Sequence, residues 1–200
     1  MISLNSFVTK KQPFPWKKKG LLFKPEDDGF SHGSHPCAIH IEGDKYVFAF
    51  TRRDELQRSH IFLSNALVSN GHIELIGTPT LALRPGDPCH FDCDGVISVC
   101  FVKHRNSIYL YYVGWQNLSE GRWICDTGRT KLDENNLTLT REFQGPVLGR
   151  DKNNPLFAAA TAFHVSNDLW HTWYNSGLRW EKTEQGWKHY YGIHYAYSSN

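Results

Sequence analysis

The run Cys37-Ala38-Ile39-His40-Ile41-Glu42-Gly43-Asp44-Lys45-Tyr46-Val47-Phe48-Ala49-Phe50 is the first of three copies of one pattern. Adding 62 to every residue number gives Val99-Cys100-Phe101-Val102-Lys103-His104-Arg105-Asn106-Ser107-Ile108-Tyr109-Leu110-Tyr111-Tyr112. Adding 62 once more gives Thr161-Ala162-Phe163-His164-Val165-Ser166-Asn167-Asp168-Leu169-Trp170-His171-Thr172-Trp173-Tyr174. Each copy has an apolar run, a polar turn and an aromatic run, and the three align without a gap. A fixed period of this kind indicates a stacked or radial array of one repeated unit.

Each copy is predicted to form a β-hairpin, because its second run is rich in aromatic and apolar residues, as strands are. The turns carry residues that suit tight hairpins: Gly43-Asp44, Arg105-Asn106 and Asn167-Asp168. Further strands are expected at residues 59–63, 72–76, 122–126, 137–141 and 192–197. Three to four strands per repeat are typical of a propeller blade, so the expected fold class is all-β with β-propeller blades. The alternative is a β-sandwich, because regular short strands also occur there.

The composition excludes several classes of function. The 200 residues carry a net charge of +2, which gives no electrostatic reason to bind nucleic acid. No apolar run approaches the roughly 18 residues of a membrane helix, and residues 1–15 lack the apolar core of a signal peptide. The odd number of cysteines, five, favours reduced thiols and a cytoplasmic location. The spacing of Cys89 and Cys93 is not that of a zinc knuckle, so neither a metal nor another cofactor is expected.

The expected organisation is a leader at residues 1–29, followed by three propeller repeats at about 30–91, 92–153 and 154–200. Known propellers have about four to eight blades, so three blades cannot close a ring. The faces at the gap should be apolar, and exposed apolar patches usually mark interfaces. We therefore expect the chain to be part of a longer propeller or to form a homo-oligomer through its terminal blades or the leader around residues 16–23.

Short motifs near the expected inner strands carry a resemblance to a known family. They are His35-Pro36-Cys37-Ala38-Ile39, Phe91-Asp92-Cys93-Asp94-Gly95-Val96 and Trp170-His171-Thr172-Trp173-Tyr174-Asn175-Ser176-Gly177. The pattern resembles the five-bladed β-propeller glycosidases of glycoside hydrolase families 43 and 32. The resemblance implies a carbohydrate ligand and action on a glycosidic bond by carboxylate acid/base chemistry. The alternatives are a non-catalytic glycan-binding propeller that has lost the catalytic acids, and a protein-interaction propeller fragment.

The resemblance also implies where catalytic groups lie. Members of these families use a general base before the first inner strand, an orienting Asp in the second blade and a Glu general acid in the third. Asp92 or Asp94 fills the second position. His35 precedes Pro36 where the family usually has Asp-Pro, and the third position, residues 153–160, contains no Glu. The predicted catalytic residues are therefore Asp92, Asp94 and His35.

Five further residues are candidates for contacts with a substrate: His32, Arg52, Trp115, Asn154 and Trp173. Histidine is the residue type that can act as an acid or a base near neutral pH, which makes His32 a candidate, although two loop histidines more often form only local hydrogen bonds. Arg52 suits a carboxylated or phosphorylated sugar, with a salt bridge as the alternative. Trp115 and Trp173 offer flat rings for stacking on a sugar, with burial as the alternative. Asn154 belongs to the loop before the third inner strand.

Overall fold

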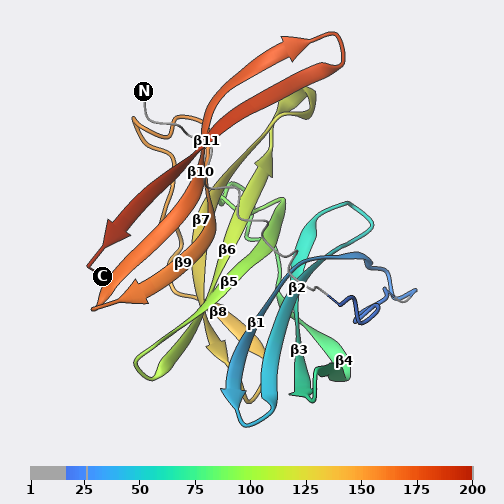
Figure 1. The fold of residues 1–200 in the computed structure, drawn as a ribbon. Coiled ribbons are helices and arrows are strands. Elements are labelled where there is room, and N and C mark those ends of the chain that lie inside the picture. The colour runs from blue at the N-terminus through green and yellow to red at the C-terminus, as the bar shows by residue number, and fades with distance from the viewer. Residues whose placement is uncertain (1–16, 26, 200) are drawn as a thin grey trace, which may run out of the picture.

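The computed structural model describes residues 17–25 and 27–199, and its strands form one continuous sheet (Figure 1). Unit I contains β1 (Ser31–Glu42), β2 (Lys45–Arg53), β3 (Ser59–Ser69) and β4 (His72–Leu83). Unit II contains β5 (Gly95–His104), β6 (Ser107–Asn117), β7 (Trp123–Asp133) and β8 (Thr138–Arg141). Unit III contains β9 (Ala158–Ser166), β10 (Leu169–Thr183) and β11 (Gly186–Ser198). A 3-10 turn, η1 (Ser119–Gly121), lies between β6 and β7.

The first hairpin of every unit recurs at the predicted interval. In each hairpin the last paired residues before the turn are Glu42 with Lys45, His104 with Ser107, and Ser166 with Leu169. Equivalent positions therefore differ by 62 residues, and each turn contains two residues. The first turn residue has a positive φ in all three cases, +51°, +52° and +52°. A left-handed residue matches the twist of the flanking strands, which is why Gly, Asn and Asp are frequent in such turns.

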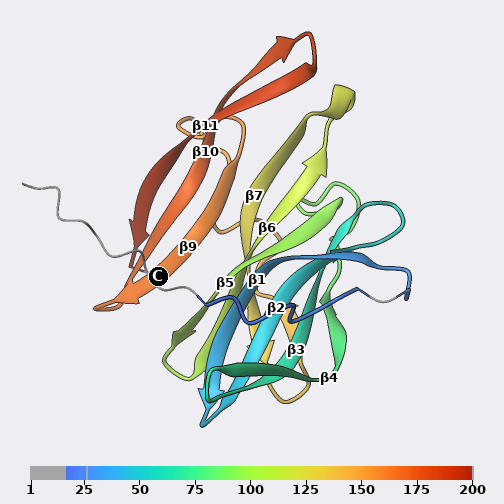
Figure 2. The ribbon, with the colours of Figure 1, turned by 45° about the vertical axis from the view of Figure 1, so that its right-hand side comes forward.

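Consecutive units are joined in series through their strands. The third strand of one unit meets the first strand of the next by a parallel bridge, Ser59 with Gly95 and Asp126 with Ala158. The first strands β1, β5 and β9 also contact one another in that order. Figure 2 shows the three units splayed side by side, and the sheet does not close on itself. A β-sandwich would instead need two separate sheets packed face to face, so the fold is all-β with the serial arrangement that the repeat predicts.

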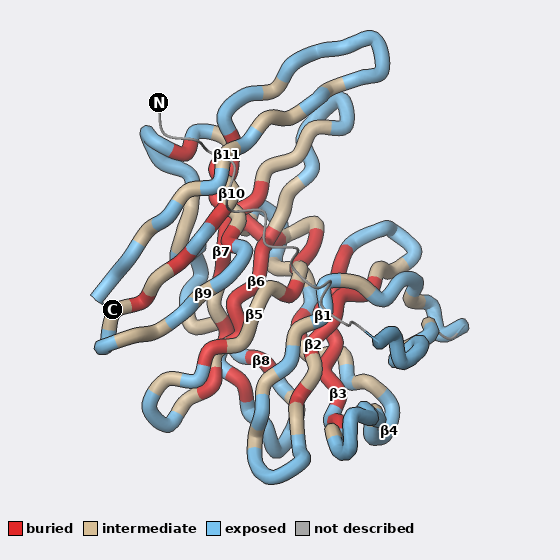
Figure 3. The backbone as a smooth tube through the Cα atoms, in the orientation of Figure 1, coloured by how far each residue is buried: buried red, intermediate tan, exposed pale blue. Residues whose placement is uncertain are grey.

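The core lies between the units and runs along the middle strands (Figure 3). Between units I and II, Val47, Ala49 and Ile61 pack on Val96 and Tyr112, and all five are at most 1% exposed. Between units II and III, the core contains Tyr111, Trp170 and partly buried Phe163. Each unit therefore buries an apolar face against the next unit, as separate hairpins could not do alone.

All five cysteines are free thiols. Burial raises the pKa of Cys37 to about 12, that of Cys100 to about 11 and that of Cys125 to about 12. A thiol is reactive only as the thiolate, so these three behave as small apolar core residues. No helix in the described part of the chain is long and apolar enough to cross a bilayer.

Candidate functional site

The first strands β1, β5 and β9 begin at the same end of the sheet, here called the head end. The Ser98 hydroxyl of β5 donates a hydrogen bond to the His35 carbonyl of β1 over 2.7 Å. The Ser98 amide donates to Oγ1 of Thr51 on β2 over 3.1 Å. Thr51 and Ser98 are both buried. The start of β1 is thus fixed against β5.

Two histidines at the head of β1 have unusual backbone conformations. His32 has φ +65° and His35 has φ +50°, and the pairing of β1 with β2 shifts register on either side of Ser34. A non-glycine residue in the left-handed region costs on the order of 1–3 kcal/mol, and such strain is concentrated at functional sites. Both residues are exposed overall, and each ring makes a local hydrogen bond, Nδ1 of His32 with the Ser31 hydroxyl at 2.7 Å and Nδ1 of His35 with the Ser34 hydroxyl at 3.0 Å. Partial removal from water and the positive charge of Arg53 lower the pKa of His35, which favours its neutral form.

A groove of about 550 Å³ lies beside these histidines, and we call it the head groove. Its floor and walls include Phe30, Ser31, His32, Arg53 and Asp54. With Asp27, Glu55 and Gln57, which also line it, the groove combines one aromatic ring with an imidazole, a guanidinium, a hydroxyl, an amide and three carboxylates. This is the kind of lining that fixes a polar ligand through several convergent hydrogen bonds.

Asp54 is the most strongly positioned carboxylate of the head groove. Oδ2 accepts hydrogen bonds from Nε2 of His60 at 3.0 Å and from Nε of Arg58 at 2.9 Å, while Oδ1 accepts from the Arg58 amide at 2.9 Å. Partial burial raises the pKa of Asp54, but these hydrogen bonds outweigh it and hold the pKa below its ordinary value. Asp54 is therefore ionised at neutral pH. Its position directly after the first aromatic strand was the available sequence signal.

The two aspartates predicted to be catalytic differ in environment. Asp92 is 1% exposed, and its Oδ2 accepts hydrogen bonds from the Tyr112 hydroxyl at 3.0 Å and from Nε and a terminal nitrogen of Arg141 at 2.9 and 2.7 Å. None of the described residues donates to its Oδ1. Asp94 is half-buried, and its Oδ2 accepts a hydrogen bond from the Asn117 amide over 2.7 Å. Asp92 thus ties the loop before β5 to β6 and β8, and its predicted catalytic role, like that of Asp94, stays a prediction.

Arg52 occupies a buried site and is not directed at a ligand groove. Its guanidinium forms two 2.7 Å hydrogen bonds with the Asp28 carboxylate and one of 2.8 Å with the Phe30 carbonyl. The side chain is 3% exposed and lies within 5.5 Å of the rings of Phe23, Phe30 and Phe62. The structure therefore favours the salt-bridge alternative for Arg52, in which it holds the segment before β1. Residues 1–16 of the predicted leader lie outside the described residues.

The remaining predicted contact residues are spread over the molecule. Trp115 donates from its indole nitrogen to the Ser59 hydroxyl over 2.6 Å, which joins β6 to β3. Asn154 is 4% exposed, and its side-chain nitrogen donates to Asp151 in the loop before β9. Trp173 is 43% exposed on β10. Of the residues predicted from the sequence, His32 lines the head groove and His35 lies in the same strand end, whereas the other contact candidates lie elsewhere.

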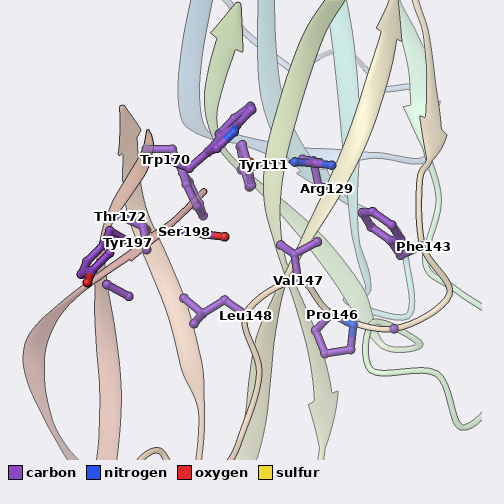
Figure 4. Close-up of a pocket in the computed structure, with 13 residues that line it drawn as sticks. Tyr111, Arg129, Phe143, Pro146, Val147, Leu148, Trp170, Thr172, Tyr197 and Ser198 are labelled. Carbon is purple, nitrogen blue, oxygen red and sulfur yellow. Dashed lines mark hydrogen bonds between the residues drawn. The ribbon is translucent and has the colours of Figure 1, made fainter. Parts of the chain in front are cut away.

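A second hollow of about 550 Å³ lies between units II and III (Figure 4). Arg129 projects into it from β7 and pairs with Glu142, and its guanidinium lies against the rings of Tyr109, Phe143 and Trp170. The walls are mostly apolar and aromatic. Because the charge of Arg129 is already matched by Glu142, this hollow offers packing surface and few polar groups for recognition.

Within the described residues, no three His, Cys, Asp or Glu side chains are grouped so that they could hold a metal ion. In the stretch that begins at Cys89, the Asp92 carboxylate accepts a hydrogen bond from Arg141, and the side-chain nitrogen of Gln116 donates a hydrogen bond to the Cys93 sulfur.

Comparison with known proteins gives relatives without an assigned activity and structural neighbours that are glycosidases. No family model matches the chain. Two proteins of Mycobacterium tuberculosis, uncharacterized proteins MT1551 and Rv1502, are each 28% identical over 170 residues, which is 82% of this chain and 56% of each relative. The chain thus spans about half the length of the curated relatives that it matches.

Among solved structures, Zg3597, a family 117 glycoside hydrolase from the marine bacterium Zobellia galactanivorans, aligns with a TM-score of 0.63 at 15% identity. The alignment covers 92% of this chain and 58% of that enzyme. A glycosyl hydrolase from Bacteroides ovatus aligns with a TM-score of 0.52 at 16% identity, over 72% of this chain and 45% of that protein. The chain therefore has a glycosidase-type propeller fold with an open sheet, and the fold alone does not establish activity.

Proposed function

We propose that this chain binds carbohydrate and that the sugar occupies the head groove. The observation that carries the proposal is the lining of this groove, at the head of the innermost strand, in a fold shared with glycoside hydrolases. His32, Arg53 and Asp54 supply donors and acceptors that suit sugar hydroxyls, and the Phe30 ring supplies an apolar face for stacking. His32 lines the groove and has a left-handed backbone conformation, a kind of strain that is concentrated at functional sites, and this supports the same assignment.

Cleavage of a glycosidic bond is the second candidate function, favoured by the ionised Asp54 carboxylate. Such cleavage needs one carboxylic acid that protonates the leaving oxygen and one carboxylate that activates water or attacks the sugar. A lowered pKa suits Asp54 to the carboxylate role and not to the acid role. A general acid is usually kept protonated by burial, and Asp27 and Glu55, the other carboxyls that line the head groove, are exposed. Of the predicted catalytic aspartates, Asp92 is paired with Arg141. Binding without cleavage is therefore the primary proposal.

We also propose that units I to III are three blades of a five-bladed propeller related to glycoside hydrolase families 43 and 32, with boundaries near residues 30–91, 92–153 and 154–200. The recurrence of the hairpin turns at 62-residue intervals supports this assignment. The greater length of the relatives is consistent with further units of the same kind.

The proposal is tested by calorimetric titration of the chain with a panel of neutral and acidic oligosaccharides. We expect at least one member to bind, and His32→Ala to weaken its affinity by about tenfold, equal to about 1.4 kcal/mol. His72→Ala is the matched control, because His72 is an exposed histidine at the opposite end of unit I, and it should leave the affinity unchanged. A panel in which no sugar binds, or equal weakening by both variants, would contradict the assignment.

A separate assay distinguishes binding from cleavage. Aryl glycosides of the sugar that binds should release no aryl alcohol if the chain only binds. Release that is abolished by Asp54→Asn would instead establish the second candidate function.

A further inference from the structure

The head groove has two walls that come from different parts of unit I. One wall is the strap, defined here as residues 27–31, which precedes β2 and reaches the start of β1, and it contributes Phe30. The other wall is the loop wall, residues 53–57 between β2 and β3, and it contributes Asp54. A ligand that touches both walls binds tightly only if their relative position is fixed before it arrives.

His60 of β3 is buried behind both walls. Its Nε2 lies 3.0 Å from Oδ2 of Asp54 in the loop wall. Its ring meets the Phe30 ring of the strap edge-on, with the centroids 5.3 Å apart and the planes at 86°. One buried imidazole therefore contacts a lining residue of each wall.

The protonation state of the His60 ring follows from its partners. The Asp54 carboxylate is ionised and can only accept, so Nε2 of His60 carries a proton and donates it. Burial lowers the pKa of His60, so the ring is uncharged at neutral pH and Nδ1 carries no proton. The atom Nδ1 is buried and has no hydrogen-bond partner among the described residues. The ring therefore makes one directed side-chain hydrogen bond, and that bond goes to the loop wall.

Packing alone does not favour a histidine at this position. The surroundings are aromatic, since the Phe30 ring also packs edge-on against Phe62, two residues after His60 on β3. A buried polar atom without a partner costs free energy, and an apolar side chain of similar size would avoid that cost. The hydrogen bond to Asp54 is the gain that offsets the unpartnered Nδ1.

Arg58 also binds Asp54, but it is a weaker restraint on the carboxylate. The Arg58 side chain is 44% exposed, whereas the His60 side chain is 4% exposed. Water and salt weaken an exposed ion pair, and a buried hydrogen bond is shielded from both. His60 is therefore expected to set the orientation of the Asp54 carboxylate.

We propose that His60 is a positioning residue of the head groove, which holds Asp54 of the loop wall and Phe30 of the strap in the arrangement that binds sugar. The inference rests on the proposed carbohydrate site, because it concerns how that site keeps its shape. His60 acts through Asp54 and Phe30 and does not itself contact the sugar. Its loss should weaken binding without removing any group that the sugar touches.

The first test uses the chain without sugar and compares two variants of His60. His60→Leu removes the hydrogen bond to Asp54 and keeps an apolar side chain against Phe30, whereas His60→Gln keeps an N–H donor near the position of Nε2. Amide spectra of the isotope-labelled variants should show shifted resonances in both walls, at Ser31 and Asp54, for His60→Leu. In His60→Gln these resonances should return toward their wild-type positions. Shifts confined to β2 and β3 would contradict the coupling of the two walls.

The second test is calorimetric titration with three neutral hexasaccharides, maltohexaose, cellohexaose and xylohexaose. For a sugar that the wild type binds, His60→Leu should weaken the affinity about tenfold, and His60→Gln should stay within about twofold of the wild type. Thr130→Val is the matched control, because Thr130 is a buried polar residue of unit II whose hydroxyl donates to the Leu110 carbonyl over 3.0 Å. It should leave the affinity unchanged, and circular dichroism checks that all three variants fold.

The His60 ring of the unaltered chain gives a readout that needs no variant. Its nitrogen resonances should show a protonated Nε2 and an unprotonated Nδ1, and saturation with a hexasaccharide that binds should shift the Nε2 proton, because Asp54 then shares its oxygens with a sugar hydroxyl. Ring resonances that do not move at saturation would overturn the proposal. So would equal affinities of the wild type and His60→Leu, equal weakening by Thr130→Val, or a failure of His60→Gln to restore binding.

The two tests also separate this inference from the proposed function. If the free variants show shifts in both walls and none of the three sugars binds, the carbohydrate assignment fails and the positioning of the walls by His60 is supported. If a sugar binds and His32→Ala weakens it while His60→Leu does not, the carbohydrate assignment is supported and the role of His60 is refuted.

Discussion

Replacing Arg141 by methionine should destabilise the fold strongly, because it leaves the Asp92 carboxylate buried without its counter-ion. Methionine keeps much of the side-chain volume but removes the two donors that lie 2.9 and 2.7 Å from Oδ2. Asp92 is 1% exposed and would retain one hydrogen bond, from Tyr112 at 3.0 Å. Removing one partner of a buried ion pair costs about 3–5 kcal/mol. We expect a loss of this size in the free energy of unfolding.

The measurement is urea denaturation followed by tryptophan fluorescence. Lys45→Met is the control, because it removes an ion pair with Glu42 whose side chains are 65% and 70% exposed, and it should leave the midpoint unchanged. The double variant Asp92→Asn/Arg141→Met should be more stable than Arg141→Met alone, since it no longer buries an unpaired charge. A single Arg141→Met variant within about 1 kcal/mol of the wild type, the scale of an exposed pair, would refute this account of Asp92.

Three further predictions concern packing, pH and thiol reactivity. Gly128→Ala should lower the free energy of unfolding by about 1–3 kcal/mol through overpacking, because the new Cβ would lie 2.3 Å from the Tyr112 ring. Gly145→Ala is the control: its Cβ would have no atom within 4 Å, so the variant should unfold at the wild-type urea concentration. Burial lowers the pKa of His60 despite its hydrogen bond to an aspartate, so its contribution to stability is present above about pH 6.5 and falls as the pH drops below that value. Thermal melts at several pH values should therefore show a melting temperature that falls below about pH 6.5, and His60→Gln should make this fall smaller. Cys89 is the exposed thiol and should react first with a thiol reagent under native conditions, while the thiols of β1, β5 and β7 should react only in denaturant.

The repeat predicted the parts of the fold that depend on local pattern. The hairpin turns lie where the 62-residue interval places them, because a two-residue turn needs a left-handed residue and the flanking strands need alternating side chains. The first strands were also located correctly, since residues 37–41, 96–102 and 161–165 lie within β1, β5 and β9. The extension of β10 to Thr183 was not predicted, because charged residues, Arg179, Glu181 and Lys182, interrupt the aromatic run beyond Gly177.

The candidate site was less accessible to sequence reasoning, because its side chains are paired over long distances in the chain. The partner of Arg52 is 24 residues away and that of Asp92 is 49 residues away, and no local pattern connects them. The positive φ angles of His32 and His35 result from register shifts against β2, which composition does not reveal. Asp54 ends the charged run Arg52-Arg53-Asp54 at the end of the first aromatic strand, but only the structure shows its contacts with His60 and Arg58.

The most direct test of the central claim is an amide chemical-shift titration of the isotope-labelled chain with the oligosaccharide that binds. We predict that the largest, saturable shifts occur around the head groove, at Ser31, His32 and Asp54, and that they disappear in His32→Ala. Saturable shifts confined to β10 and β11, or to the hollow around Arg129, would contradict the claim that the head groove is the carbohydrate site.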